Sequence, residues 1–471
     1  MSLATLTENY LESFSDFEAR AAGHRLPWLK NLRGDAFARF CQIGFPTTHD
    51  EDWRFTNVSA LAQTAFRLAP ASRTQLSPEA IEPYRVPGAS VQLVFVDGRF
   101  APELSRIAHL PDGVEAGSLA AKIESDPAEL EPLLGRYFDS GRDAFSALNT
   151  AFLEDGAYIR VRKGTVVEEP ICLLFVSSSA APEATSPVPA AGAIMTHPRN
   201  LIVVGENAHA GFLEDYVSLG QDAAFCNSVT VLLAGDHSVA THSMIERENL
   251  HSFNVSTLRI QQGRASDVAS HSLLLGGALV RNNVHPVLAG EGAECLINGL
   301  FVGGGKQHLD NYMLVEHASP RCASRQFYNG ILDGHSSGVF HGRIIVQKDA
   351  QKTDSKQTNR NLLLSDDARI DTKPQLEIYA DDVKCTHGAT IGQIDAEALF
   401  YLRSRAISES DARKLLLVAF ASECLDRMKP GPVRERMEKL IQTCLAQVAN
   451  SVTAASSGGG TGGVGYWEAA E

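Results

Sequence analysis

A thiol and an imidazole lie two positions apart near the end of the sequence, at Cys385 and His387. They follow a strand-like apolar run, residues 376–380, and precede a segment with helical periodicity. Residues two apart on an extended strand share one face, so this sulfur and nitrogen can point at the same metal ion. Gly388 and Gly392 are expected to let the backbone turn from strand into helix. A Cys-x-His pair alone leaves another interpretation open, a buried cysteine beside a hydrogen-bonded histidine.

A glycine-rich segment, residues 303–306, resembles a phosphate-binding loop because it reads Gly-Gly-Gly-Lys. Gln307 occupies the position where Ser or Thr would reach magnesium, and Leu300 stands where the first glycine belongs. A β-turn is the better interpretation of this segment. We therefore expect that the chain does not bind ATP itself.

Histidines and aspartates form two other candidate groups. His335 and His341 flank a Ser-Ser-Gly segment, where core or turn roles are the expectation. Five aspartates could supply acid and base to a cytoplasmic β-helix hydrolase or lyase that acts on polysaccharides, with Asp371 and Asp381 as the first to test: Asp366, Asp367, Asp371, Asp381 and Asp382. Clustered aspartates are more often turn residues or a solvated rim.

Composition narrows the class of protein. The 471 residues, 44% of them hydrophobic, predict two to four structural units at roughly 150 residues each. A net charge of −14 argues against nucleic-acid binding, which needs clustered Lys and Arg. The eight cysteines include no Cys-x-x-Cys pair, which is typical of a reducing compartment. With no secretory signal and no apolar run of about 18 residues, we expect a cytoplasmic protein that does not enter a membrane.

The pattern of apolar residues divides the chain into four parts. Residues 1–155 are predicted to be mainly helical, and residues 156–392 to form a β core, because short apolar runs there alternate with Gly, Asn, Asp and His. Residues 393–450 return to helical periodicity, and 451–471 form a glycine-rich flexible tail. So many short strands favour a solenoid or barrel-like stack, although no exact repeat is visible. Residues 177–192 are predicted to be a loop that interrupts it.

Several longer motifs occur between residues 327 and 405, and one occurs near the start of the chain. They are Phe-Tyr-Asn-Gly (327–330), Gln-Lys-Thr-Asp (351–354), Gln357, Asn-Arg-Asn-Leu-Leu-Leu-Ser (359–365), Pro-Gln-Leu-Glu-Ile (374–378), Cys-Thr-His-Gly-Ala-Thr (385–390), Leu-Phe-Tyr-Leu-Arg-Ser-Arg (399–405) and, early in the chain, Gly-Phe-Pro-Thr (44–47) with Glu51, Trp53 and Arg54. Together they resemble the SufB/SufD family of iron–sulfur cluster assembly proteins, and most closely its SufD branch.

The resemblance implies a mainly β fold, with a right-handed parallel β-helix between N-terminal and C-terminal helical domains. It implies a non-catalytic subunit of the SUF complex that supports iron acquisition and cluster assembly with a SufB-like sister chain and a SufC-like ABC ATPase. The ATPase is expected to grip residues 394–424. The partner-binding candidates there are Leu399, Phe400, Tyr401, Arg403 and Arg405.

Two positions depart from the SufB pattern. Asn359 and Gly388 stand where SufB-like chains carry a functional cysteine and a glutamate. The resemblance therefore implies a SufD-like partner that contributes His387, with Cys385 as a second candidate, to a transient iron or iron–sulfur cluster at the heterodimer interface. Thiolate and imidazole are both known cluster ligands. The sequence leaves open whether a flavin takes part and whether the chain forms a homodimer when alone.

Overall fold

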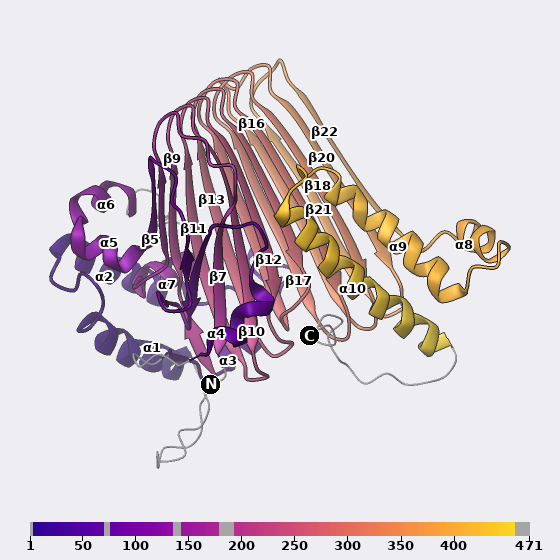
Figure 1. Ribbon diagram of the computed structural model, residues 1–471, viewed down its shortest axis with the longest axis horizontal. Coiled ribbons are helices and arrows are strands. Elements are labelled where there is room, and N and C mark those ends of the chain that lie inside the picture. The colour runs from indigo at the N-terminus through magenta and orange to yellow at the C-terminus, as the bar shows by residue number, and fades with distance from the viewer. Residues whose placement is uncertain (1–2, 70–75, 135–142, 179–192, 457–471) are drawn as a thin grey trace, which may run out of the picture.

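The computed structural model describes residues 3–69, 76–134, 143–178 and 193–456. Its core is a parallel β-helix in which successive long strands alternate between two sheets (Figure 1). Sheet A contains β6 (Ala157–Val161), β9 (Arg199–Val204), β11 (Ala224–Ala234), β13 (Phe253–Gln262), β15 (Leu279–Leu288), β17 (His308–His317), β19 (Ser337–Val346) and β21 (Arg369–Ile378). Sheet B contains β2 (Val91–Val96), β7 (Ile171–Ser178), β10 (His209–Leu219), β12 (Val239–Arg247), β14 (Asp267–Leu274), β16 (Glu294–Gly303), β18 (Ala323–Leu332), β20 (Asp354–Leu363) and β22 (Lys384–Gly392). The predicted β-helix is confirmed, and its right-handed sense stays a prediction.

The length of each coil explains why no exact repeat is visible in the sequence. Phe253 pairs with Leu279, 26 residues later, whereas Ser337 pairs with Arg369, 32 residues later. The strands themselves keep a constant register, and the extra residues lie in the turns. Apolar side chains from both sheets fill the space between them and form the largest core cluster.

One corner of the β-helix repeats a backbone conformation. In the described chain a residue with positive φ occupies this corner in seven coils: Gly164, Asn207, His237, Ala265, Gly292, Arg321 and Lys352. Its N–H donates to a carbonyl in the next coil, as from Ala265 to Glu291 at 2.9 Å and from Arg321 to Gln351 at 2.8 Å. Glycine is the residue best suited to this conformation, yet only two of these seven corners have it. The repeat is therefore one of geometry rather than of residue type.

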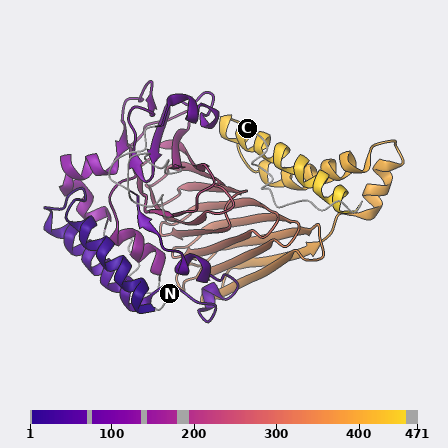
Figure 2. The same ribbon diagram turned by 90° about the horizontal axis from the view of Figure 1, so that it is seen from below.

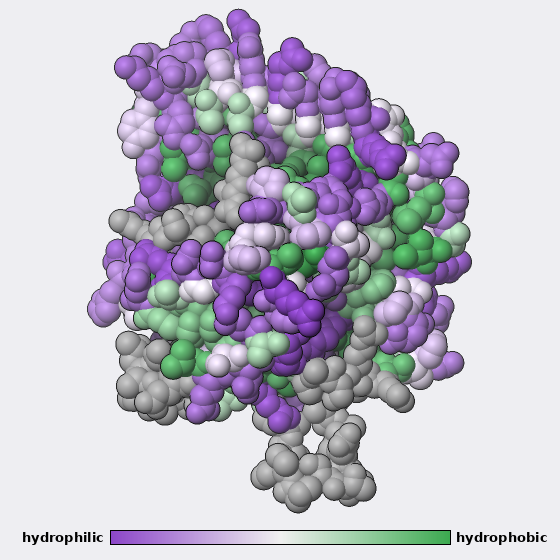
Figure 3. Space-filling view, turned by 90° about the vertical axis from the view of Figure 1, so that its left-hand side faces the viewer, coloured by the Kyte–Doolittle hydropathy of each residue, from purple (hydrophilic) through white to green (hydrophobic). Residues whose placement is uncertain are grey.

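The N-terminal part closes one end of the β-helix and covers the outer face of sheet A (Figures 1 and 2). Its helices are α1 (Leu3–Glu18), α2 (Pro27–Ile43), α3 (Ser59–Gln63), α4 (Pro78–Ile81), α5 (Leu119–Ser125), α6 (Pro127–Leu134) and α7 (Ala144–Ala151), with short 3-10 turns at Glu51–Trp53 and Glu82–Tyr84. Its short strands are β1 (Arg67–Leu68), β3 (Arg99–Phe100), β4 (Arg106–Ile107) and β5 (Val114–Ser118), and β1 pairs with the short strand β8 (Ile194–Thr196) of sheet A. Polar residues make up most of the surface at this end, with separate apolar groups between them (Figure 3).

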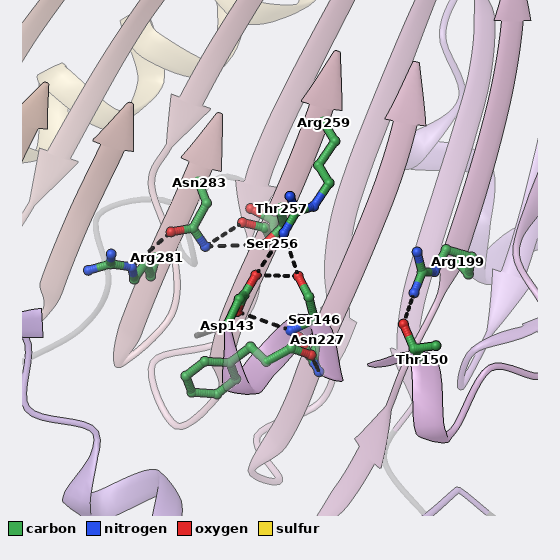
Figure 4. Close-up of polar contacts among 11 residues, drawn as sticks. Asp143, Ser146, Thr150, Arg199, Asn227, Ser256, Thr257, Arg259, Arg281 and Asn283 are labelled. Atoms are coloured by element: carbon green, nitrogen blue, oxygen red, sulfur yellow. Dashed lines mark hydrogen bonds and ion pairs between the residues drawn. The ribbon is translucent and has the colours of Figure 1, made fainter. Parts of the chain in front are cut away.

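Polar contacts attach α7 to sheet A (Figure 4). Arg259 of β13 lies 3.2 Å from the Asp143 carboxylate at the start of α7. Asn227 of β11 donates to the Phe145 carbonyl at 2.9 Å. Burial raises the cost of leaving such groups unpaired, so these contacts fix the helix at one position on the sheet. An aromatic cluster around Phe152 completes the packing.

Two of the C-terminal helices, α9 (Glu409–Leu425) and α10 (Pro432–Ser456), lie on the outer face of sheet B, and their apolar residues pack against it (Figures 1 and 2). The short helix α8 (Ala396–Arg403) projects beyond the sheet, next to α9. Asp215 of β10 is buried between the guanidinium groups of Arg247 and Arg436, each 3.0 Å away. Breaking a buried ion pair leaves an uncompensated charge, so this contact secures α10. No helix in the described ranges combines the length and apolar character needed to cross a membrane.

Two predicted segments fall largely on residues that the structure does not describe. The loop predicted at 177–192 lies outside the described residues from position 179 onward. The tail predicted at 451–471 begins inside α10, which runs to Ser456, and the rest lies outside the described residues.

The repeated corner predicts that Ala265→Gly stabilises the protein. Ala265 has φ of 51°, where its Cβ is crowded, and glycine adopts this conformation without that cost. Removing the Cβ relieves backbone strain of roughly 1–2 kcal/mol. Glycine also makes the unfolded chain more flexible, which costs about 0.4–1 kcal/mol. The free energy of unfolding should therefore rise by about 0.5–1 kcal/mol. Urea denaturation measures it. The matched control is Ala269→Gly, inside β14, which should destabilise; a loss of stability in both variants would contradict the prediction.

Candidate metal site on the last strand

Within the described chain, β22 pairs with β20 alone and forms one edge of sheet B. The Lys384 N–H donates to the Thr353 carbonyl at 2.8 Å. In a parallel ladder the residues that bond to one neighbour alternate with those that face the other side. The backbone groups of residues 385, 387 and 389 therefore point away from β20. This edge offers a row of donors and acceptors to a further strand.

Cys385 and His387 continue two columns of inward-facing residues. Cys385 pairs with Ser355, and His387 pairs with Gln357. Both partners are buried inside the β-helix, whereas Cys385 is half-buried and His387 is exposed. The prediction that the thiol and the imidazole share one strand is confirmed, and the pair is not buried in the core.

Ser355 and Gln357 lie beneath this pair, and neither was predicted from the sequence to be a site residue. Ser355 bonds to Ser324 through their hydroxyl groups at 2.8 Å, and Gln357 donates to the Gln326 side chain at 2.9 Å. These bonds lock the neighbouring coils beneath the edge strand. The signal was present in the sequence, because a Ser-x-Gln pair at 324–326 and 355–357 precedes Cys-x-His at the same inward positions.

The expected turn at the two glycines is wrong. Gly388 lies in the middle of β22 and Gly392 is its last residue, so the chain leaves the sheet only over residues 393–395. A Cβ at Gly388 would meet no atom within 4 Å. Asn359, the other departure from the SufB pattern, is buried and donates to the Tyr328 carbonyl at 3.2 Å. Asn359 thus has a packing role, and the open space at Gly388 lies on the opposite face of β22 from the candidate ligands.

Among the cysteines, Cys385 is the one that lies beside an exposed histidine two positions along the same strand. Burial raises the pKa of its thiol, and a backbone hydrogen bond from Ser355 partly opposes that shift. Six other cysteines are buried, and Cys41 is exposed on α2. In the described chain no three His, Cys, Asp or Glu side chains lie close enough to hold a metal ion. A four-coordinate ion at Cys385 and His387 would need further ligands from outside this part of the chain.

The structure does not bring the aspartates together. Asp366 and Asp367 precede β21, Asp371 is its third residue, and Asp381 and Asp382 follow it. The seven-residue rise from Asp371 to the end of β21 alone spans about 23 Å at 3.3 Å each, far beyond the 5–10 Å of a glycosidase pair. Asp382 instead forms an ion pair with Lys352. This geometry gives no support to the hydrolase alternative.

The other chemical candidates have structural roles. His341 is buried and lies 2.8 Å from the Gln375 side chain, and burial lowers its pKa. His335 lies in an exposed turn 3.6 Å from Asp367. Residues 303–306 lead from β16 into the turn before β17, as the β-turn interpretation predicts.

The predicted partner-binding residues lie on and just after α8, a few residues beyond β22. Phe400 is 75% exposed and Tyr401 is 56% exposed, so two aromatic rings face solvent on one short helix. Leu399 is half-buried, and Arg403 pairs with Glu409 at 3.2 Å. Arg405 lies 4.1 Å from the centre of the Tyr401 ring. These residues form a surface separate from the Cys385–His387 pair.

The fold and this strand define a parallel β-helix protein with a potential two-ligand metal site on its last strand. Family models agree with that class. One, described as SUF system FeS cluster assembly, SufBD core domain, matches residues 188–420, and the SufBD protein N-terminal region matches residues 4–173. The chain belongs to the SufB/SufD family of iron–sulfur cluster assembly proteins, in its SufD branch.

Individual relatives cover nearly the whole chain. A SufBD family protein of Synechocystis is 34% identical over 433 residues, 90% of this chain and 93% of the relative. The iron-sulfur cluster assembly protein SufD of Escherichia coli is 32% identical, over 84% of this chain and 88% of the relative. SufD of Bacillus subtilis is 26% identical, over 94% of this chain and 99% of the relative.

The burial pattern predicts selective thiol labelling. In the folded chain iodoacetamide should modify Cys385 and Cys41, while the six buried cysteines stay protected. Because burial raises the pKa of Cys385, its labelling at pH 7 should be slower than that of a free cysteine and should rise about tenfold per pH unit until the pKa is reached. Peptide mass spectrometry over a pH series measures this. Labelling of buried Cys295 at the same rate as Cys385 would refute it, and the urea-unfolded chain is the control.

Proposed function

We propose that this chain is a non-catalytic, SufD-like subunit of a cytoplasmic SUF complex, where it supports iron acquisition and cluster assembly. Iron or a nascent cluster is the cargo, held by His387 and Cys385 together with ligands from a SufB-like sister chain. The observation that carries this proposal is the open edge of β22 with both donors on it. The E. coli and B. subtilis relatives, named as iron–sulfur cluster assembly proteins, support it.

The chemistry of the two donors suits a site that must release its cargo. Thiolates are the usual ligands of iron–sulfur clusters, and imidazole replaces some of them in known centres. A closed cage of four cysteines would retain its cluster. Two donors at an exposed edge bind a metal ion only when a second chain completes the set, so assembly and release can follow the contact between chains.

The same edge gives the sister chain a way to bind. Strand addition satisfies backbone groups that water otherwise solvates, and side chains then set the specificity. Exposed Ile391 on β22 and exposed Ile378 and Tyr379 at the end of β21 would provide apolar contacts. A partner strand beside β22 would carry its own ligands to within reach of His387.

The SufC-like ATPase is proposed to dock on α8. Aromatic residues dominate the binding energy of many protein interfaces, and α8 presents Phe400 and Tyr401 to solvent. Asp395 caps the helix through bonds to the N–H groups of Glu397 and Ala398, so the aromatic side chains are carried on an ordered helix.

Removing the imidazole tests the ligand role. We expect His387→Ala, co-expressed with SufB-like and SufC-like chains and purified without oxygen, to assemble normally but to lose most of its iron and acid-labile sulfide. The matched control is His335→Ala, which removes another exposed histidine, in a turn, and should leave both unchanged. Metal analysis and sulfide assay per complex give the answer. An intact complex with the iron content of wild type would show that His387 is not a ligand.

Removing the two aromatic rings of α8 tests the ATPase contact. Phe400→Ala with Tyr401→Ala should abolish co-purification of the SufC-like chain and leave the SufB-like chain bound. Two interface anchors at about 2 kcal/mol each would weaken binding by roughly 30-fold apiece. Leu11→Ala on α1, 54% exposed and outside residues 394–424, is the control and should have no effect. Retention of the ATPase by the double variant would place its contact elsewhere.

A further inference from the structure

Two buried glutamines form a side-chain ladder beneath His387, inside the last coils of the β-helix. Gln326 of β18, Gln357 of β20 and His387 of β22 occupy the same register position on three successive strands of sheet B. The Gln357 carboxamide nitrogen donates to the Gln326 carboxamide oxygen at 2.9 Å. Successive strands lie about 4.8 Å apart, so a side chain of this length reaches its neighbour in the column directly. The ladder therefore leads along the β-helix to the candidate ligand.

The ladder has a direction, which follows from the planar shape of a carboxamide. The Gln357 nitrogen is turned toward Gln326 on the preceding coil, so the oxygen of the same group is turned away from it, in the direction of β22. That oxygen is buried and has no hydrogen-bond partner among the described residues. At the other end of the ladder, the Gln326 nitrogen follows the apolar Ile297 in the column. The end of the ladder with a free acceptor is thus the end at His387.

The opposite sheet holds the carboxamides in this orientation. Gly342 of β19 packs against them, and a Cβ at residue 342 would collide with the Gln357 nitrogen and come within 3.1 Å of the Gln326 oxygen. A residue with a side chain at this point would displace the ladder. Gln357 is 1% exposed and is restrained by close packing on one side and a hydrogen bond on the other, so its oxygen keeps facing the last strand.

His387 is placed to provide the missing donor. Leaving a buried acceptor without a partner costs about 1–3 kcal/mol. A neutral imidazole has one N–H donor and one acceptor nitrogen. His387 is exposed on an edge strand, so its ring has room to turn. When the acceptor nitrogen binds a metal ion, the N–H on the other side of the ring remains available to Gln357.

We propose that Gln357 is a positioning residue for the candidate metal ligand. Its carboxamide oxygen accepts a hydrogen bond from one ring nitrogen of His387 while the other ring nitrogen binds iron or a nascent cluster. Metal-ligating histidines almost always make such a bond, which fixes the tautomer and the plane of the ring. Gln326 holds Gln357 in the required orientation. This inference rests on the proposed function, because it takes His387 to be a ligand.

A neutral acceptor suits a ligand that must release its cargo. A carboxylate at this position would make the imidazole more basic and bind the metal ion more tightly. The carboxamide of Gln357 orients the ring without adding a charge. The ladder thus supports His387 during binding and leaves its affinity for the metal ion moderate.

The first experiment uses the complex of all three chains, co-expressed and purified without oxygen. Gln357→Leu keeps a side chain of similar size without the acceptor. We expect iron per complex to fall by about threefold or more at unchanged subunit composition, because losing the bond to a metal-ligating histidine weakens metal binding roughly 10- to 100-fold. Gln357→Glu restores an acceptor and should keep iron at or above the wild-type level. The matched control is Gln262→Leu, which removes a buried carboxamide in β13 and should leave iron unchanged.

A spectroscopic readout separates positioning from a general loss of stability. Cu²⁺ added to the iron-free complex serves as a paramagnetic probe, and His387→Ala identifies the signal of the bound imidazole. Electron spin echo measurements report the quadrupole coupling of the ring nitrogen that does not bind the metal ion, and this coupling changes with the hydrogen bond of that nitrogen. We expect the coupling in Gln357→Leu to differ from wild type and the coupling in Gln262→Leu to equal it.

The outcomes separate this inference from the function it rests on. If Gln357→Leu does not fold, Gln357→Asn shortens the side chain by one methylene, withdraws the oxygen from His387 and should lose iron in the same way. Wild-type iron or an unchanged coupling in the folded variant, while His387→Ala loses iron, would overturn this inference alone. Gln357→Glu with as little iron as Gln357→Leu would overturn it as well. Wild-type iron in His387→Ala would instead overturn the ligand role itself, and this inference with it.

Discussion

The hydrogen bonding of the last parallel strand is the constraint on which the rest of the structure depends. A strand in a parallel sheet satisfies its backbone only when it has a neighbour on each side. At the N-terminal end β5, β3 and β4 provide neighbours by antiparallel pairing, and helices cover the surface around them. At the other end β22 has one neighbour within the described chain. The molecule is therefore closed at one end and open at the end where Cys385 and His387 lie.

Sheet B uses both of its faces, and this gives the open end a second connection. Its inward face packs in the apolar core, and its outward face packs against α9 and α10. Directional contacts fix those helices at two distant points, Asp215 with Arg436 near the start of the sheet and Asn329 with Phe420 near its end. These contacts hold α9 and α10 at particular positions on the sheet, which apolar packing alone would not specify.

Local patterns made part of the site predictable. The two-residue spacing of Cys385 and His387 indicated a shared face, because side chains alternate along any strand. The change from helical to strand-like spacing of the apolar residues indicated the β core, and the motifs shared with the SufB/SufD family indicated the β-helix. The turn assigned to Gly388 was wrong because glycine permits a turn without requiring one, and pairing with Thr358 keeps it extended.

The sequence by itself determined the family, the β-helix and the placement of Cys385 and His387 on one strand, since each depends on residue types that are close together in the chain. The tertiary structure alone decided that β22 is an edge, that the aspartates on either side of β21 lie far apart, and that Asn298 and Asn329 reach carbonyls 126 and 91 residues later. These features depend on how many residues each turn adds between strands of constant register. When the coils stack, the lengths of the turns decide which residues of successive coils become neighbours. No local pattern in the sequence encodes these contacts.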